Sequence, residues 1–251
     1  MATMVLQKGH RRLEVFPDED IMITSYPRSG NTWVRFLLAN LIANSGQAID
    51  FPAMEKIIPD VNKSSKWVNL SERPATGRLI KSHIPYDPAF KRVIYIVRDG
   101  RDVKVSYYHY HCPHNFQDTF LEFLQRDVWP GPWHEHVASW LDHANDISLL
   151  LVRYEDMLTQ PEEQLRRMAE FARLPTDKER IAQAVTHSSF TSLQSIEQER
   201  GEDRRGPDFK FFRRGICGQW RQYFGPEHKV VFRPHADPVL RRLGYIDGTD
   251  W

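Results

Sequence analysis

The sequence predicts an α/β fold, a single three-layer domain in which a central parallel sheet is flanked by helices. Four short apolar runs have the length and composition of buried strands, at residues 20–25, 78–82, 92–97 and 147–152. Helical patterns separate these runs along the chain, and strands that alternate with helices usually pair in parallel. A length of 251 residues is sufficient for one complete core. We therefore expect residues 1–251 to form one domain.

Composition argues against several classes of protein. The chain has 34 Lys and Arg against 33 Asp and Glu, a net charge of +1, so nucleic acid is not an expected partner and any anion site must be local. The first residues lack the apolar core of a signal peptide, and no run of 18 apolar residues occurs, so we expect a cytoplasmic protein with no membrane partner. Cys112 and Cys217 are too few for a disulfide framework and are expected to be reduced.

The first strand leads into the loop Ser25-Tyr26-Pro27-Arg28-Ser29-Gly30-Asn31-Thr32-Trp33, and the helical pattern at residues 32–44 follows. Backbone N–H groups at the start of a helix have no intrahelical partner and face the positive end of the helix dipole. Arg28 adds a fixed charge, and Ser29 and Thr32 add hydroxyl groups. The loop is therefore a candidate phosphate-like anion site, although an ordinary strand-to-helix turn would also contain Ser, Gly and Asn.

Residues 50–77 contain Pro52, Pro59 and Pro74 and are expected to be irregular surface excursions. The strand that follows ends in Lys81-Ser82-His83, and Pro85 stops regular structure there. His83 thus lies at the carboxyl end of a strand, where open parallel sheets bind ligands. A lone histidine is more often structural, so the surrounding residues must decide its role.

The run at residues 92–97 is followed by Arg98 and by a helical stretch at 103–111 that Asp99 can cap. Ser106 lies one to two turns into this helix, so the arrangement repeats the anion-site pattern of the first loop. A capped helix with a surface salt bridge would show the same residues. After it, His109, His111, Cys112 and His114 match no standard zinc spacing, and we predict no metal site.

The second half of the chain is mostly helical. Helices are expected at about 116–126 and 134–145, and the aromatic residues of this part either pack in the core or line an apolar acceptor pocket. Two further helices are expected, one from Pro161 to about Arg173 and one over about 177–186. The charged, glycine-containing stretch at about 199–211 is expected to be a lid that orders on ligand binding, or else a plain surface loop.

Three of these segments resemble, in the same order, signatures of the cytosolic-type sulfotransferases that use 3′-phosphoadenosine 5′-phosphosulfate (PAPS). TSYPRSGNTW resembles the phosphosulfate-binding loop YPKSGTTW, a P-loop-like element, with Arg28 for Lys and Asn31 for Thr. RDGRDVKVSYYHY resembles the segment that binds the 3′-phosphate, and FRRGICGQW resembles RKGxxGxW, with Arg214 for Lys. VRYEDML and the weaker match Ser188-Ser189-Phe190 resemble segments that contact the adenine.

The resemblance implies transfer of the PAPS sulfuryl group to a hydroxyl of a small-molecule acceptor, with adenosine 3′,5′-bisphosphate (PAP) as the product and no metal. It assigns His83 as general base, with Lys81 and Arg28 stabilising negative charge. The donor-binding residues that it implies are Arg28, Ser29, Gly30, Asn31, Thr32, Trp33, Arg98, Ser106, Tyr154, Ser188, Phe190, Arg213, Arg214 and Gly215. Arg28 would be a fixed cation, because its pKa is too high for proton donation.

Two other functions are open on the residues alone. A nucleotide kinase-like phosphotransferase shares strand-loop-helix phosphate sites, but it needs a conventional P-loop and a magnesium carboxylate, and the first loop has Gly30 alone. A non-catalytic adenine-nucleotide-binding protein is the second, and Lys81 and His83 argue against it. The sequence does not identify the acceptor. The oligomeric state also stays open, since residues 235–251 do not match the family's dimer motif K-x-x-x-T-V-x-x-x-E.

Overall fold

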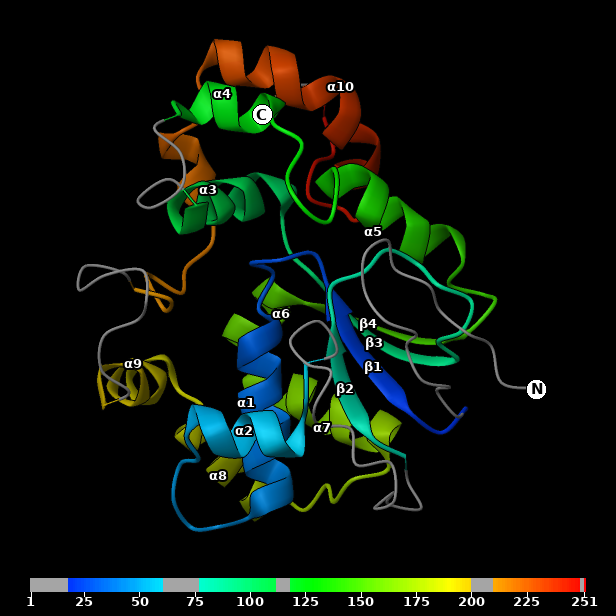
Figure 1. The fold of residues 1–251 in the computed structure, drawn as a ribbon, viewed down its shortest axis with the longest axis vertical. Helices are drawn as coiled ribbons and strands as arrows, with labels where there is room; N and C mark the ends of the chain where they lie inside the picture. Colours follow the sequence, from blue (N-terminus) through cyan, green and yellow to red (C-terminus); the bar gives the residue numbers. More distant parts are fainter. Residues whose placement is uncertain (1–17, 61–76, 112–117, 200–209, 249–250) are drawn as a thin grey trace.

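The computed structural model describes residues 18–60, 77–111, 118–199, 210–248 and 251 (Figure 1). Within these residues one parallel sheet has the strand order β2-β1-β3-β4. Its strands are β1 (Ile21–Ser25), β2 (Leu79–Ser82), β3 (Arg92–Val97) and β4 (Ser148–Arg153). The predicted fold class and all four predicted strands are confirmed, with bounds shifted by no more than one residue.

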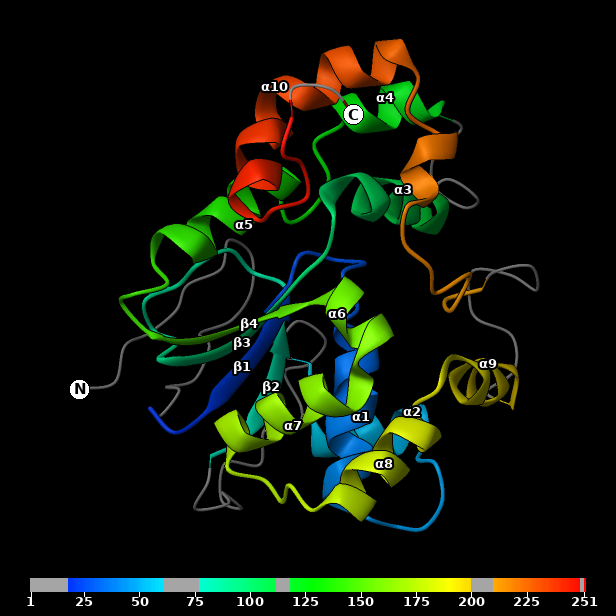
Figure 2. The same cartoon turned by 180° about the vertical axis from the view of Figure 1, so that it is seen from behind.

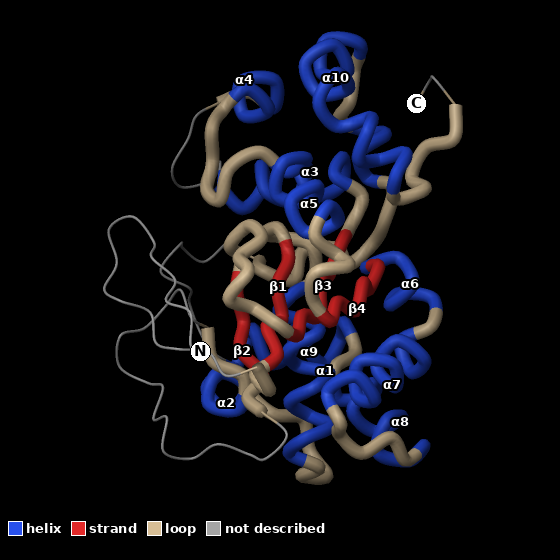
Figure 3. The backbone as a smooth tube through the Cα atoms, turned by 90° about the vertical axis from the view of Figure 1, so that its right-hand side faces the viewer, coloured by secondary structure: helices blue, strands red, loops and turns tan. Residues whose placement is uncertain are grey.

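Alternating side chains of the central strands divide the core into two parts. Ile21 and Ile23 of β1 point to one face of the sheet, and Met22 points to the other, as the two-residue period of a strand requires. Both faces are covered by helices, which explains why these strands are apolar throughout rather than alternating with polar residues. Figure 3 shows the resulting three layers, with the strands between two groups of helices.

One helix layer packs on the face of Ile21 and Ile23. Its helices are α1 (Asn31–Ala43), α2 (Phe51–Ile57), α6 (Tyr154–Thr159), α7 (Pro161–Ala172), α8 (Lys178–His187) and α9 (Phe190–Glu199). The other layer consists of α3 (Gly100–His111), α4 (Phe120–Gln125), α5 (Trp133–Asp142) and α10 (Pro226–Arg242). A short 3-10 helix, η1 (Gln219–Gln222), precedes α10. Figure 2 shows both layers from behind, on opposite sides of β1.

The expectation that residues 50–77 are irregular is wrong for α2. Asp50 caps this helix, because its Oδ1 accepts a hydrogen bond of 2.8 Å from the backbone N–H of Ala53. Pro52 lies in the first turn, where a missing N–H costs nothing, so it starts a helix rather than breaking one. Met54 and Ile58 are buried, and this burial is what attaches the segment to the core.

The sequence pattern also does not indicate α10, because Pro234 and Pro238 lie inside it. The helix is held by tertiary packing. Phe232, Ala236 and Leu240 are buried against α4 and α5. The free energy gained by burying these apolar side chains offsets the unfavourable helix propensity of the two prolines.

The strand order determines where a ligand site can form. β1 has β2 on one side and β3 on the other, so the chain leaves β1 and β3 in opposite directions. Such a switch point leaves a crevice outside the carboxyl ends of the strands. The residues after β1, β2 and β3 therefore meet at one edge of the sheet.

Within the part of the chain that the structure describes, no helix combines the length and the apolar character that crossing a membrane requires.

Candidate active site

The loop after β1 is shaped by two residues with left-handed backbone. Arg28 has φ 71° and Gly30 has φ 103°. A Cβ at Gly30 would lie 2.7 Å from the ring of Tyr154, so only glycine fits where the loop approaches this ring. Asn31 donates from Nδ2 to the carbonyl oxygen of Ile23 at 3.1 Å and thereby ties the helix start to β1. The amide of Asn31 thus has a structural partner as well as a place in the cavity wall.

His83 lies directly beside this loop. Its Nδ1 is 2.7 Å from the carbonyl oxygen of Ser25, which can only accept, so Nδ1 carries the hydrogen. The other ring nitrogen, Nε2, is then unprotonated in the neutral ring. Desolvation lowers the pKa of His83 well below its usual value of 6.5, and the Lys81 ammonium group lowers it further. The ring is therefore neutral at pH 7 and can accept a proton.

Lys81, two residues earlier, has a partner that the sequence did not indicate. Its Nζ lies 2.6 Å from Oδ2 of Asp60, and both side chains are buried. Asp60 belongs to the stretch that was expected to be irregular surface, yet residue 60 forms an isolated parallel bridge with residue 81 of β2. The pair places a buried carboxylate beside the Lys81 ammonium group and so fixes the direction of the Lys81 side chain.

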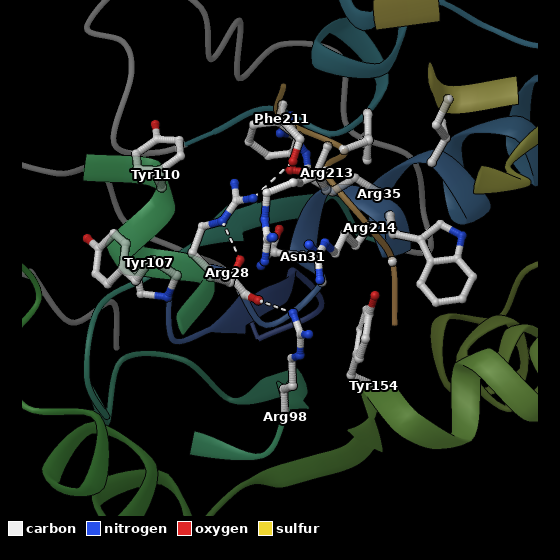
Figure 4. A pocket seen from close by; sticks show the side chains of 18 of the residues that line it. Arg28, Asn31, Arg35, Arg98, Tyr107, Tyr110, Tyr154, Phe211, Arg213 and Arg214 are labelled. Carbon is white, nitrogen blue, oxygen red and sulfur yellow. Dashed lines mark hydrogen bonds between the residues drawn. The ribbon is translucent and has the colours of Figure 1, made fainter. Parts of the chain in front are cut away.

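Arg98, at the end of β3, joins two distant loops. Its guanidinium donates to the carbonyl oxygen of Arg28 at 3.2 Å and to that of Ile216 at 3.0 Å, and it lies 4.4 Å from the ring centroid of Tyr154. Its Nε is buried and has no protein partner among the described residues. Ser106 accepts a hydrogen bond of 3.2 Å from Arg28 Nε, so the two predicted anion sites are adjacent. Figure 4 shows these arginines converging on one cavity.

The segment of residues 211–218, called the clasp below, completes the cavity from the C-terminal part of the chain. Arg213 donates to Oε1 of Gln219 at 2.7 Å, and Arg214 is exposed. The clasp is anchored by Asp102 of α3, whose carboxylate accepts from the backbone N–H groups of Gly218 at 2.6 Å and Trp220 at 2.9 Å. The sequence pattern did not indicate this role of Asp102. Asp99 caps α3 as expected, accepting from the N–H of residue 101 at 3.0 Å.

The residues expected to contact adenine are partly brought together. Tyr154 and Trp33 line the cavity with edge-to-face rings 5.8 Å apart, and Phe190 lies over Gly215 of the clasp. Ser188 does not line the cavity. Its hydroxyl accepts from Asn40 Nδ2 at 3.0 Å, and its carbonyl oxygen accepts from Trp33 Nε1 at 2.9 Å, so it positions the tryptophan from behind. Ser29 is likewise buried outside the cavity wall.

These elements enclose a cavity of about 500 Å³. Its wall contains one described carboxylate, from Asp60, and six cationic side chains, from Arg28, Arg35, Lys81, Arg98, Arg213 and Arg214. A chain with a net charge of only +1 therefore concentrates positive charge in one place, and the cavity suits a ligand with several negative charges. Arg35 was missed by sequence reasoning, although an arginine within the apolar pattern of α1 is a signal that could have drawn notice.

Aromatic side chains line the part of the cavity near His83 and Arg28. Trp129 is 52% exposed, with its ring centroid 6.0 Å from that of His83. Tyr107 and Tyr110 of α3 lie in the same wall. Other aromatic residues of this part of the chain, such as Trp140, are fully buried core residues. Within the aromatic run, Trp129 therefore lines the cavity and Trp140 packs in the core, whereas the acceptor-pocket role stays a prediction.

Two predictions from the sequence concern residues that are partly outside the described ranges. The expected lid at 199–211 includes residues 200–209, and the histidine-cysteine cluster includes Cys112 and His114. Over the ranges that the structure does cover, no group of three or more His, Cys, Asp or Glu side chains is arranged to hold a metal ion. Cys217, in the clasp, is exposed and has a free thiol.

A doubly covered parallel sheet with a polycationic cavity at its switch point defines a class of α/β protein that binds phosphorylated ligands. Comparison with known proteins narrows this class. The family model for the sulfotransferase domain matches residues 18–244. The chain therefore belongs to the sulfotransferase family, and the resemblance that its motifs indicate is confirmed.

Individual relatives agree. Sulfotransferase 1B1 of Mus musculus is 29% identical over 246 residues, covering 85% of this chain and 80% of the relative. Sulfotransferase 1 family member D1 of Rattus norvegicus is 30% identical over 242 residues, covering 84% and 79%. Among solved structures, mouse sulfotransferase SULT7A1 in complex with PAP has a TM-score of 0.68 at 25% identity, covering 91% of this chain and 86% of that one. Retinol dehydratase with androsterone and inactive cofactor PAP has the same fold, with a TM-score of 0.67 at 21% identity and coverage of 89% and 81%.

Proposed function

We propose that the protein transfers the sulfuryl group of PAPS to a hydroxyl of a small-molecule acceptor, with His83 as general base. The observation that carries this proposal is the hydrogen bond from His83 Nδ1 to the carbonyl oxygen of Ser25, at 2.7 Å. It leaves Nε2 as the proton acceptor on a neutral ring that lines a polycationic cavity. Family membership and the bound PAP of a mouse relative support the choice of donor.

In the proposed reaction the acceptor O–H gives its proton to Nε2 of His83. The acceptor oxygen then forms a bond to sulfur while the bond between sulfur and the bridging phosphate oxygen breaks, and PAP leaves with the bonding electrons. Negative charge grows on the bridging oxygen, and the charges of Lys81 and Arg28 stabilise it. Arg28 acts as a fixed cation, since a guanidinium does not give up a proton at neutral pH.

The donor would lie along the cavity in an order that the elements suggest. We assign its 5′-phosphosulfate to the loop of Gly30 and Thr32. Its 3′-phosphate is assigned to Arg98 after β3, Ser106 of α3, and Arg213 and Arg214 of the clasp. The adenine would bind between the rings of Trp33, Tyr154 and Phe190. The cavity of about 500 Å³ has both cationic and aromatic lining residues, and this supports the placement.

The acceptor is proposed to be a small hydroxylated molecule bound between Trp129, Tyr107 and Tyr110, next to His83. Aromatic walls favour an apolar or aromatic acceptor body. One relative is an amine sulfotransferase from Oryctolagus cuniculus, 25% identical over 255 residues, so an amine acceptor is a second case worth assaying.

One sheet and one family match over residues 18–244 support a single domain for residues 1–251. The cytoplasmic location stays a prediction.

Isothermal titration calorimetry with PAP and with AMP tests the donor assignment. Each charge-assisted bond to the 3′-phosphate is worth roughly 1.5–3 kcal/mol, so PAP is expected to bind at least about 100-fold more tightly than AMP. Equal affinities would remove the donor assignment. A turnover assay with PAPS and a panel of phenols, alcohols and amines then separates an enzyme from a protein that only binds the nucleotide.

A further inference from the structure

Helix α5 holds the segment that carries His83 through three of its backbone groups. His136 lies with Nε2 3.1 Å from the carbonyl oxygen of His83. Trp140 donates from Nε1 to the carbonyl oxygen of Ile84 at 3.2 Å, and Ser139 Oγ accepts from the N–H of Tyr86 at 3.1 Å. The three α5 residues are spaced i, i+3 and i+4, so they lie on one face of the helix. None of them belongs to the cavity wall.

The protonation of His136 follows from its two partners. The side chain is 1% exposed, and desolvation lowers its pKa to about 4, so the ring is neutral at pH 7. The carbonyl oxygen of His83 can only accept, so Nε2 of His136 carries the hydrogen. The hydroxyl of Tyr95 lies 3.0 Å from Nδ1 and donates to it. Burial raises the pKa of Tyr95 well above its usual value, so this hydroxyl stays protonated.

The ring of His136 is also fixed by packing. The ring of Tyr26 meets it edge to face, with centroids 5.5 Å apart, and the ring of Tyr95 is stacked on it at 6.0 Å. Tyr26 is itself held, because its hydroxyl donates to the carbonyl oxygen of Gly131 at 2.9 Å. Rotation of the imidazole would lose both hydrogen bonds and strike these rings, so a single orientation is retained.

We propose that His136 is a positioning residue for His83, with Tyr95 selecting its tautomer. His136 fixes the backbone at residue 83, and the bond from Nδ1 to Ser25 fixes the ring, so the direction of Nε2 is determined at both ends. Proton transfer requires a heavy-atom separation of about 2.6–3.2 Å, so a small shift of this backbone would move the base out of reach of the acceptor. The inference rests on the proposed role of His83 and adds α5 to the catalytic architecture without contact to the substrate.

The variants His136→Leu and His136→Gln test the hydrogen bond directly. Leu removes the donor, and we expect kcat to fall by about 10- to 100-fold, as misplacement by about 1 Å does. Gln places an amide N–H near the position of Nε2 and is expected to restore kcat to within about fivefold of wild type. The dissociation constant of PAP, measured by calorimetry, is expected to change by less than about twofold in both, because the donor site is not altered.

The matched control is Gln164→Leu on α7, which removes a buried amide that accepts from Arg167 at 2.6 Å and does not line the cavity. We expect a lower melting temperature and an unchanged kcat per folded molecule. If His136→Leu behaves like this control, or if His136→Gln is as slow as His136→Leu, the positioning role is wrong.

Two further variants keep the test decisive. Tyr95→Phe retains the ring and its packing but removes the hydroxyl, and it replaces His136→Leu if that variant does not fold. It is expected to lower kcat by several-fold, about 3- to 10-fold, and wild-type kcat would overturn the tautomer assignment. His83→Ala distinguishes a failure of the base assignment for His83 from a failure of the positioning role for His136. If it turns over normally, the base assignment itself fails, whereas a slow His83→Ala beside a fast His136→Leu contradicts only the inference about α5.

Discussion

The two sides of the cavity are built in different ways. The strand-end side consists of the carboxyl ends of β1, β2 and β3 and the loops that follow them. Its Lys81 and His83 have buried partners, Asp60 and the carbonyl oxygen of Ser25. The clasp side consists of residues 211–218, among which Arg214, Ile216 and Cys217 are exposed. Its attachment to α3 is made by backbone N–H groups that donate to the carboxylate of Asp102.

From this difference we expect the chemical step and the binding of the donor to depend on different groups. Parallel strands place their carboxyl ends with little freedom, so the groups proposed to move a proton and stabilise charge are held where burial also adjusts their pKa. Part of the clasp lies at the surface, so the exposed side chain of Arg214 can adjust to the 3′-phosphate. Changes at Lys81 and His83 should therefore affect kcat, whereas changes at Arg98 and in the clasp, which are assigned to the 3′-phosphate, should affect donor affinity.

The largest effect is expected for His83→Ala. Loss of a general base typically reduces the rate by about 10²- to 10⁴-fold, while PAP affinity should change little, because the phosphate-binding groups are intact. The rate of the wild-type protein as a function of pH is expected to reflect the lowered pKa of His83. Since the pKa of His83 lies well below 6.5, the rate should fall only when the pH drops well below 6.5, as the base becomes protonated. Single-turnover kinetics measure the rate, and calorimetry on the same protein measures the PAP affinity.

A suitable control for this variant is His143→Ala. His143 is a surface histidine, stacked on Tyr86 with centroids 4.0 Å apart and paired with Asp146. We expect it to keep full turnover. A folded His83→Ala protein with normal kcat would contradict the strand-end side of the comparison.

A smaller effect, on binding, is expected when a buried and an exposed arginine are compared. Arg98→Ala removes a cation that is 6% exposed, and PAP affinity is expected to fall by roughly 1.5–3 kcal/mol, which is about 10- to 150-fold. Arg214→Ala removes an exposed cation in high dielectric, and its loss is expected to be about 1 kcal/mol or less.

In both variants kcat at saturating PAPS should stay close to wild type. Affinity is read by calorimetry and folding by the melting temperature, which corrects for the bonds that Arg98 makes to two carbonyl oxygens. A loss for Arg214→Ala as large as that for Arg98→Ala would show that the clasp grips the 3′-phosphate as firmly as the strand end does.

The smallest effect is expected for Asp102→Asn. Asparagine keeps the size, but its amide has only one oxygen to accept from the N–H groups of Gly218 and Trp220, and its NH₂ group faces the other N–H. We expect a loss of about 1–2 kcal/mol in the free energy of unfolding and a decrease of only a few-fold, about three- to fivefold, in PAP affinity. Urea unfolding and calorimetry measure these changes. A decrease in kcat with unchanged affinity would break the proposed separation.

Much of the fold could be predicted because it depends on local signals. The strands at 92–97 and 147–152 are short apolar runs bounded by polar residues, and such runs remain recognisable in isolation. The helix at α7 begins at a proline and has acidic residues in its first turn, which are also local features. By contrast, α10 contains two prolines and forms because its apolar face is buried against α4 and α5, and that burial depends on residues about 100 positions away.

The site divides in the same way. Arg28, Gly30 and Arg98 could be predicted because they lie just beyond the carboxyl ends of two strands, and the parallel sheet brings such ends together. Asp60 could not be predicted, because its importance comes from its 2.6 Å contact with Lys81 across 21 residues of sequence. The hydroxyl of Ser188 was expected at the donor, but it is bonded to Asn40, a contact that spans 148 residues.

The sequence by itself determined the class of the fold, the family and the identity of the groups proposed to do the chemistry, since these depend on residue type, spacing and strand ends. Only the tertiary structure decided how those groups are held. The tautomer of His83, the buried partner of Lys81, the attachment of the clasp to Asp102 and the contact of α5 with the His83 backbone all join segments that are distant in sequence. All of these contacts have the same physical reason. A buried polar group must find a hydrogen-bond partner, and the packing of the chain, rather than its local pattern, determines which partner is within reach.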